Sequence, residues 1–134
     1  DAAQGLKVLH PPGPITVIST GYMTHKALAV VDTLKKRGIN IGLIDICRIK
    51  PLPEDNLLTM VQSSLKLITV EENSILGGLG TAVGEMLLRH SSRIQLQCIA
   101  LPDCQCFEYG SRDWLLDRYG MSIDSIARII EGNL

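Results

Sequence analysis

The sequence is poor in aromatic residues and has no long apolar run, no run of one charge and no secretory pattern. Its 134 residues include one Trp, one Phe and three Tyr. No apolar segment approaches the roughly 18 residues that a membrane-spanning helix needs, and the N-terminus does not resemble a signal sequence. Thirteen basic and fourteen acidic residues, without a run of either sign, leave no electrostatic footprint for nucleic acid or an anionic membrane. We therefore expect a soluble chain with neither kind of partner.

Several common site motifs are also missing. Gly78 and Gly80 are followed by Gly84, one residue too late for the dinucleotide-binding pattern G-x-G-x-x-G, and no P-loop lysine follows them. Ser111 lacks the G-x-S-x-G context of a nucleophile elbow. Nucleotide binding at these glycines and acyl transfer at Ser111 are therefore disfavoured.

The cysteines do not form a recognised redox or zinc pattern. Cys104 and Cys106 make C-x-C rather than the C-x-x-C of a redox helix, and with Cys98 they offer no fourth ligand at zinc spacing. A chain of this size can build a core without disulfides, so we expect reduced thiols and a cytoplasmic protein. A thiol-based redox function of Cys104 and Cys106 is an alternative that requires a lowered thiol pKa.

What the sequence does contain is a regular alternation of strand and helix patterns. Strands are predicted over residues 15–20, 39–46, 65–70 and 94–101. Helices are predicted over residues 22–37, 54–62, 79–90, 112–118 and 122–131. Short links between alternating elements favour a mostly parallel sheet with helices on both faces. We predict a three-layer α/β/α sandwich.

A stiff segment precedes this pattern. Three prolines and a glycine at positions 11–14 forbid a helix and favour an extended connection, whereas residues 6–9 have the composition of a short edge strand. Residues 1–14 are therefore either a linker or a fifth strand, and residues 15–134 are predicted to form one domain.

The glycine-rich stretch at residues 69–81 lies between a predicted buried strand and a strongly periodic helix. Gly77, Gly78 and Gly80 allow positive φ angles and close approach of the backbone, and Glu71 and Glu72 precede them. If Gly78 holds a positive φ angle, Gly78→Val should cost about 1–2 kcal/mol from strain. The two carboxylates would repel a phosphate, so we interpret the stretch as a structural or interface turn.

Polar residues follow the predicted strands at one edge of the sheet, where ligands of open α/β sheets bind. Thr20, His25 and Arg48 are the candidates for the rim of a small-anion site at this edge. This alternative makes the chain a free-standing, flavodoxin-like module that binds an anionic metabolite.

The one Phe and the one Trp occur together with a Tyr at residues 107–114. Ser111 is a predicted N-cap for the helix that follows it. Because aromatic residues and arginine are enriched at interface centres, Arg112 and Trp114 are candidates for partner contact.

Taken in order, these segments resemble the transketolase C-terminal domain. The most specific part is T-V-E-E-N at residues 69–73 followed by G-G-L-G at residues 77–80, and K-P-L at residues 50–52 agrees with it. The resemblance covers residues 15–130. It implies a five-stranded, mostly parallel α/β/α domain of a thiamine-diphosphate enzyme that works as a homodimer. The family includes transketolase, 1-deoxy-xylulose-5-phosphate synthase and the β subunits of 2-oxoacid dehydrogenases.

In that family other domains hold thiamine diphosphate and its Mg ion, through a Gly-Asp-Gly motif and a glutamate at the aminopyrimidine ring. This chain contains no Gly-Asp-Gly. The resemblance therefore implies an association domain that binds no cofactor or metal and is not catalytic alone. Its partners would be other domains or subunits of the parent enzyme, with a transketolase as the leading parent and a synthase or a dehydrogenase β subunit as the alternative. The resemblance carries an interface role to Glu71, Glu72, Gly77, Gly78 and Gly80.

Overall fold

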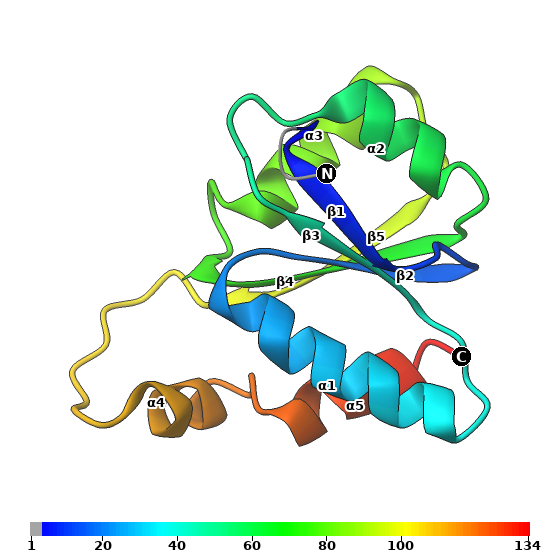
Figure 1. The fold of residues 1–134 in the computed structure, drawn as a ribbon. Coiled ribbons are helices and arrows are strands. Elements are labelled where there is room, and N and C mark those ends of the chain that lie inside the picture. The colour runs from blue at the N-terminus through cyan, green and yellow to red at the C-terminus, as the bar shows by residue number, and fades with distance from the viewer. Residues whose placement is uncertain (1–3) are drawn as a thin grey trace.

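The computed structural model describes residues 4–134 and shows one sheet between two layers of helices (Figure 1). The strands are β1 (Leu6–His10), β2 (Ile15–Ser19), β3 (Gly42–Ile46), β4 (Lys66–Ser74) and β5 (Gln95–Leu101). The helices are α1 (Tyr22–Lys36), α2 (Glu54–Val61), α3 (Leu79–Arg89), α4 (Arg112–Arg118) and α5 (Ile123–Glu131). The predicted three-layer α/β/α sandwich is confirmed.

The strands lie in the order β1-β3-β2-β4-β5. β1 runs antiparallel to β3, and all other neighbours are parallel. Parallel neighbours need helical crossovers, which explains why strands and helices alternate from β2 onward. Of the two alternatives for residues 1–14, the structure contains the edge strand, because β1 pairs with β3. Residues 1–3 lie outside the described part.

Two apolar clusters, one on each face of the sheet, form the core. α1 and α5 pack on one face together with Leu116 of α4, and α2 and α3 pack on the other. Figure 1 shows these two layers below and above the sheet. β2 lies in the centre and all of its residues are buried, as expected for a strand covered on both faces.

α1 agrees with its sequence pattern. Gly38, just past its end, has the predicted left-handed conformation with φ 81°, and its N–H group donates to the Lys35 carbonyl. The predicted apolar stripe faces the core, and the exposed fraction is at most 1% for Met23, Ala27, Val30, Val31 and Leu34.

Two strand boundaries differ from the prediction by more than one residue. β3 begins at Gly42 rather than at residue 39, because the Ile39 N–H donates to Leu34 at the end of α1. β4 continues past the predicted end at residue 70 to Ser74, because Ser74 still pairs with Leu101 of β5. In both cases a contact outside the local pattern decides the boundary.

Within residues 4–134 no helix has the length and apolar content to cross a bilayer.

Candidate protein-contact surface at the glycine turn

The glycine turn, residues 75–78, joins β4 to α3. At its start the Ile75 N–H donates to the Leu101 carbonyl at 2.8 Å, and near its end the Gly77 N–H donates to Thr81 Oγ1 at 2.9 Å. Gly77 has φ 79°, in the left-handed region that disfavours side chains. The turn is therefore fixed to β5 on one side and to α3 on the other.

Glu71 lies beneath this turn with its side chain fully buried. Its Oε2 accepts hydrogen bonds from the Leu79 N–H at 2.7 Å and from Asn73 Nδ2 at 3.2 Å, and its Oε1 accepts from the Gly80 N–H at 2.8 Å. A carboxylate in this place satisfies the free N–H groups of the helix and faces the positive end of its dipole. The chain thus supplies its own anion where a phosphate would otherwise bind.

A glycine is needed at position 78 because the backbone there packs closely against Glu71. The prediction that Gly78 has a positive φ angle is wrong. Its φ is −92°, a value open to any residue. A Cβ on Gly78 would lie 2.2 Å from Glu71 Oε2, and a Cβ on Gly80 would lie 2.6 Å from Cys98 Sγ. These two glycines let α3 sit directly on β4 and β5. The positive φ angle belongs to Gly77.

α4 is tied to this region by polar contacts. Arg112 Nε lies 3.2 Å from Glu72 Oε2, and the guanidinium carbon lies 4.4 Å from the centre of the Tyr22 ring. Asp113 pairs with Lys26 Nζ at 2.9 Å and accepts from the Tyr22 hydroxyl at 3.1 Å. These two donors, Lys26 first, hold the pKa of Asp113 below its ordinary value. Tyr22 could not be identified as a contact of α4 from the sequence, because no local pattern connects the two.

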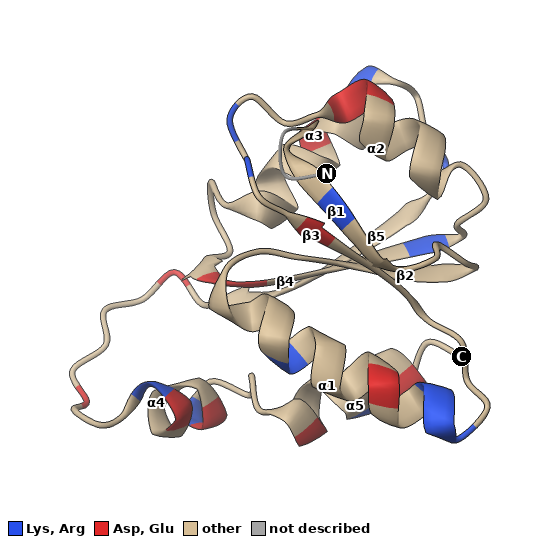
Figure 2. Ribbon diagram, in the orientation of Figure 1, with Lys and Arg blue, Asp and Glu red and all other residues tan. Residues whose placement is uncertain are grey.

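The N-terminus of α4 is built as predicted. The Ser111 hydroxyl accepts from the Trp114 N–H at 3.3 Å, which is the expected N-cap bond. Trp114 is 48% exposed, and a Cβ on Gly110 would lie 2.4 Å from its ring. Figure 2 shows residues of both charge signs along α4. α4 therefore offers a half-exposed indole ring among mixed charges.

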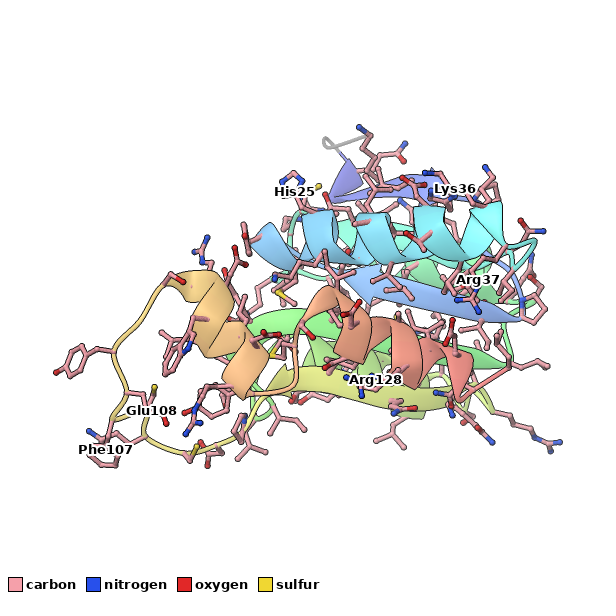
Figure 3. The ribbon with its side chains drawn as sticks, turned by 90° about the horizontal axis from the view of Figure 1, so that it is seen from below. His25, Lys36, Arg37, Phe107, Glu108 and Arg128 are labelled. Atoms are coloured by element: carbon pink, nitrogen blue, oxygen red, sulfur yellow. The ribbon has the colours of Figure 1, made fainter. Side chains whose placement is uncertain are left out.

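Large apolar side chains face solvent on this side of the molecule. The glycine turn and the loop before α4 both lie beyond the carboxyl ends of the parallel strands (Figure 1), and Figure 3 shows Phe107 pointing away from the body of the domain. Exposed apolar side chains at this end of the sheet are candidates for protein contact. We define the contact surface by its exposed members: Ile75 (42%), Leu76 (65%), Phe107 (79%), Tyr109 (97%) and Trp114 (48%).

Of the predicted interface residues, Trp114 belongs to the contact surface, and the others lie near it or in the interior. Gly77 and Arg112 are exposed, and Glu72 and Gly78 are partly exposed. Glu71 and Gly80 are buried, because the first holds the N-terminus of α3 and the second lies against β5. Any effect of these two residues on a partner therefore acts through the shape of the glycine turn.

The candidates for an anion site do not share a hollow within residues 4–134. The Thr20 hydroxyl donates to a carbonyl of β3 at 2.8 Å, and His25 projects from α1 into solvent (Figure 3). Arg48 borders a hollow of about 500 Å³ that Glu54 and Asp55 also line, and their negative charge disfavours an anion. The anion site stays a prediction.

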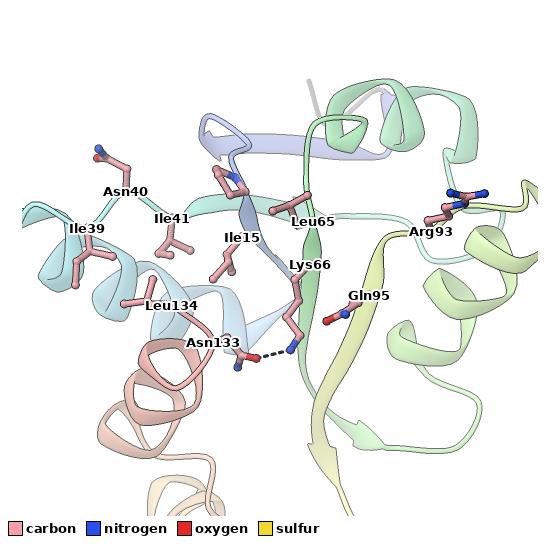
Figure 4. Close-up of a pocket in the computed structure, with 11 residues that line it drawn as sticks. Ile15, Ile39, Asn40, Ile41, Leu65, Lys66, Arg93, Gln95, Asn133 and Leu134 are labelled. Atoms are coloured by element: carbon pink, nitrogen blue, oxygen red, sulfur yellow. Dashed lines mark hydrogen bonds between the residues drawn. The ribbon is translucent and has the colours of Figure 1, made fainter.

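A larger hollow lies at the opposite end of the sheet, beside the starts of β2, β4 and β5 (Figure 4). It has a volume of about 700 Å³, and isoleucine, leucine and proline side chains share its wall with polar ones. Its Lys66 is already hydrogen-bonded to Asn133. Ligands of parallel α/β sheets bind at the carboxyl ends of the strands, so this hollow lies away from the expected edge.

A chain of hydrogen bonds links β2, α1 and β3. Ser19 Oγ donates to Thr24 Oγ1 at 3.0 Å, which donates to Asp45 Oδ1 at 2.8 Å. Burial, and next the Asp45 carboxylate, raise the pKa of the Cys47 thiol. Across residues 4–134 no group of three or more His, Cys, Asp or Glu side chains is placed to hold a metal ion. The Asp45 carboxylate fastens the start of α1 to β3 through its hydrogen bond from Thr24.

The sheet has parallel strands and one antiparallel edge strand, and helices cover both of its faces. An internal carboxylate holds the glycine turn. The protein is therefore a three-layer α/β/α domain. The family model described as "Transketolase, C-terminal domain" matches residues 5–126. The chain therefore belongs to the transketolase C-terminal domain family, as its motifs predicted.

Known relatives are longer than this chain. It is 34% identical over 122 residues to the 1-deoxy-D-xylulose-5-phosphate synthase of Clostridium tetani, a match that covers 91% of this chain and 20% of that protein. It is 36% identical over 127 residues to a transketolase family protein of Sinorhizobium fredii, with 93% and 36% covered. Its fold is similar to a split-gene transketolase solved as an inactive beta4 tetramer, with a TM-score of 0.84, 27% identity and 96% and 42% covered.

Proposed function

We propose that this chain is the association domain of a thiamine-diphosphate-dependent enzyme of the transketolase type. In this proposal the whole enzyme is a cytoplasmic homodimer that transfers two-carbon ketol groups, and this domain is not catalytic alone. The match at residues 5–126 and the 20% coverage of the synthase support it, because most of such an enzyme lies outside this segment. The remaining domains or subunits hold thiamine diphosphate and Mg.

The observation that carries the proposal is the contact surface itself. Its apolar side chains stand at the strand ends, where an α/β domain would usually bind a ligand. The neighbouring N-terminus of α3, the best local site for a cofactor phosphate, is already filled by Glu71. Apolar groups beside an occupied anion site suit a protein partner better than a diphosphate.

Assembly of the parent enzyme tests this proposal. The chain is expressed with the rest of its parent, and ketol transfer and complex formation are measured for Leu76→Asp and Leu65→Asp. Both leucines are exposed, at 65% and 72%, but Leu65 precedes β4 at the opposite end of the sheet. Burying a leucine side chain contributes about 1.5–3 kcal/mol, so Leu76→Asp should weaken assembly at least about tenfold. Equal assembly of both variants would contradict the proposal.

Cofactor titration tests whether the isolated domain binds thiamine diphosphate by itself. Isothermal titration of thiamine diphosphate and Mg into this chain should give no stoichiometric heat, because other domains hold the cofactor in this proposal. Saturable, magnesium-dependent binding by the chain alone would overturn that assignment.

A further inference from the structure

Within the described residues 4–134, β5 is an edge strand of the sheet, with β4 on one side and no strand on the other. Backbone hydrogen bonds from Gln95 and Leu101 reach β4 and the glycine turn, so these residues point inward. Peptide groups of successive residues in a strand point to opposite sides. The backbone N–H and C=O groups that point outward therefore belong to Leu96, Cys98 and Ala100.

No group within residues 4–134 pairs with these outward N–H and C=O groups. Figure 3 shows β5 along a border of the molecule. Natural edge strands commonly carry lysine or proline, which discourages pairing with another chain. β5 reads QLQCIAL and carries neither. The edge is open, uncharged and able to accept another strand.

Helix α3 packs closely against β5 on one face of the sheet. A Cβ on Gly80 would lie 2.6 Å from Cys98 Sγ, and one on Gly84 would lie 3.4 Å from Leu96 Cδ2, so this side of α3 runs along β5. One turn further on the same side, Leu88 is 81% exposed. A strand added to β5 would therefore find an apolar side chain beside it.

The charges that flank β5 indicate which partner fits. Arg93 precedes the strand and Asp103 follows it, both are exposed, and neither makes an ion pair inside the described chain. In an antiparallel twin centred on Cys98, Leu96 lies opposite Ala100 of the second copy. Arg93 lies two residues before β5 and Asp103 two residues after it, so an antiparallel twin brings the Arg93 end of one copy beside the Asp103 end of the other. The edge is self-complementary in hydrogen bonding and in charge.

We propose that two copies of this chain join their β5 strands antiparallel about Cys98 and form one continuous sheet. The proposal rests on the association function above, and it names a second copy as one partner and β5 as the surface. Every outward N–H and C=O group of Leu96, Cys98 and Ala100 then has a partner. Main-chain bonds provide the affinity of such strand addition, and the flanking charges set its register.

Charge reversal tests the register. Sedimentation equilibrium gives the dimer Kd for the wild-type chain, for Arg93→Asp, for Asp103→Arg and for the double variant. Each single change turns two attractions of the symmetric dimer into repulsions and should raise the Kd about tenfold. The double variant should restore the wild-type Kd. A wild-type chain that stays monomeric up to about 1 mM, or single reversals without effect, would refute the proposal.

Both charges are exposed and lie outside the core, so the single variants should keep the wild-type circular dichroism spectrum. Ala29→Asp, on the exposed side of α1, is the control for adding a carboxylate elsewhere. It should leave the Kd unchanged. If it weakens the dimer as much as Arg93→Asp does, the effect is one of net charge and the β5 register is refuted.

Residue-resolved amide exchange identifies the surface directly. A higher protein concentration should slow exchange at Leu96, Cys98 and Ala100, whose N–H groups are free in a monomer. Gln97 and Ile99 face β4 and should be protected at every concentration. If a dimer forms but the amides of Leu96, Cys98 and Ala100 stay unprotected, the two copies associate through another surface. That result refutes β5 pairing but not the association function. A β5 dimer whose Leu76→Asp variant still assembles the parent enzyme refutes only the role of the contact surface.

Discussion

Replacing Gly78 with alanine tests how the glycine turn is held. The added Cβ would lie 2.2 Å from Oε2 and 2.7 Å from the carboxyl carbon of Glu71. Contacts this short force the buried carboxylate to move. It then loses the N–H groups of Leu79 and Gly80, from which it now accepts at 2.7 and 2.8 Å.

The magnitude follows from the charge on Glu71. A hydrogen bond to a charged group contributes about 1.5–3 kcal/mol, and a buried charge that loses its partners costs about 3–5 kcal/mol. Gly78→Ala should therefore lower the free energy of unfolding by about 3–5 kcal/mol. Gly77→Ala should cost only about 1–2 kcal/mol, because its φ is 79° but no atom lies within 4 Å of the added Cβ.

Urea unfolding followed by circular dichroism measures these changes. Gly13→Ala is the control, because its Cβ meets no atom within 4 Å and its φ is not positive, so its stability should change by less than about 1 kcal/mol. A double-mutant cycle with Glu71→Ala isolates the clash. In that background Gly78→Ala should lose most of its cost. An equal cost in both backgrounds, or one no larger than that of Gly77→Ala, would refute the reasoning.

Three further predictions concern other parts of the domain. Thr69 Oγ1 is buried and has no hydrogen-bond partner within residues 4–134, so Thr69→Val should raise the free energy of unfolding by about 1 kcal/mol, and a lower melting temperature would contradict this. The lowered pKa of Asp113 means that its contacts with α1 are complete above its ordinary pKa of 3.8 and are lost as the pH falls through the lower folded value. Trp114 fluorescence should follow that loss, and Asp113→Asn should abolish the step; a step that persists in the variant has another origin. Gly42→Ala should cost about 1–3 kcal/mol in urea unfolding, since the Cβ would lie 2.7 Å from both Pro12 Cα and Thr16 Oγ1; wild-type stability would show that this backbone can yield.

Part of the candidate surface could be predicted from the sequence. The aromatic residues near Trp114 and the N-cap at Ser111 are local features, and the structure shows both. The different duties of Glu71 and Glu72 could not be predicted from their adjacency. Alternate residues of a strand face opposite sides, so the first turns toward α3 and the second toward Arg112 of α4. Which helix lies on each side is decided by segments distant in the sequence.

The sequence by itself determined the order of strands and helices, the buried stripe of α1, the turn at Gly38 and the family. These features depend on periodicity, on backbone freedom and on motif order, which are all local to the chain. Three features were decided only by the tertiary structure. Glu71 accepts hydrogen bonds at the N-terminus of α3, Tyr22 donates to Asp113 of α4, and β5 is an open edge of the sheet. The physical reason is that a periodic pattern specifies which face of an element is buried, whereas the segment that covers this face is selected by long-range packing and hydrogen bonding.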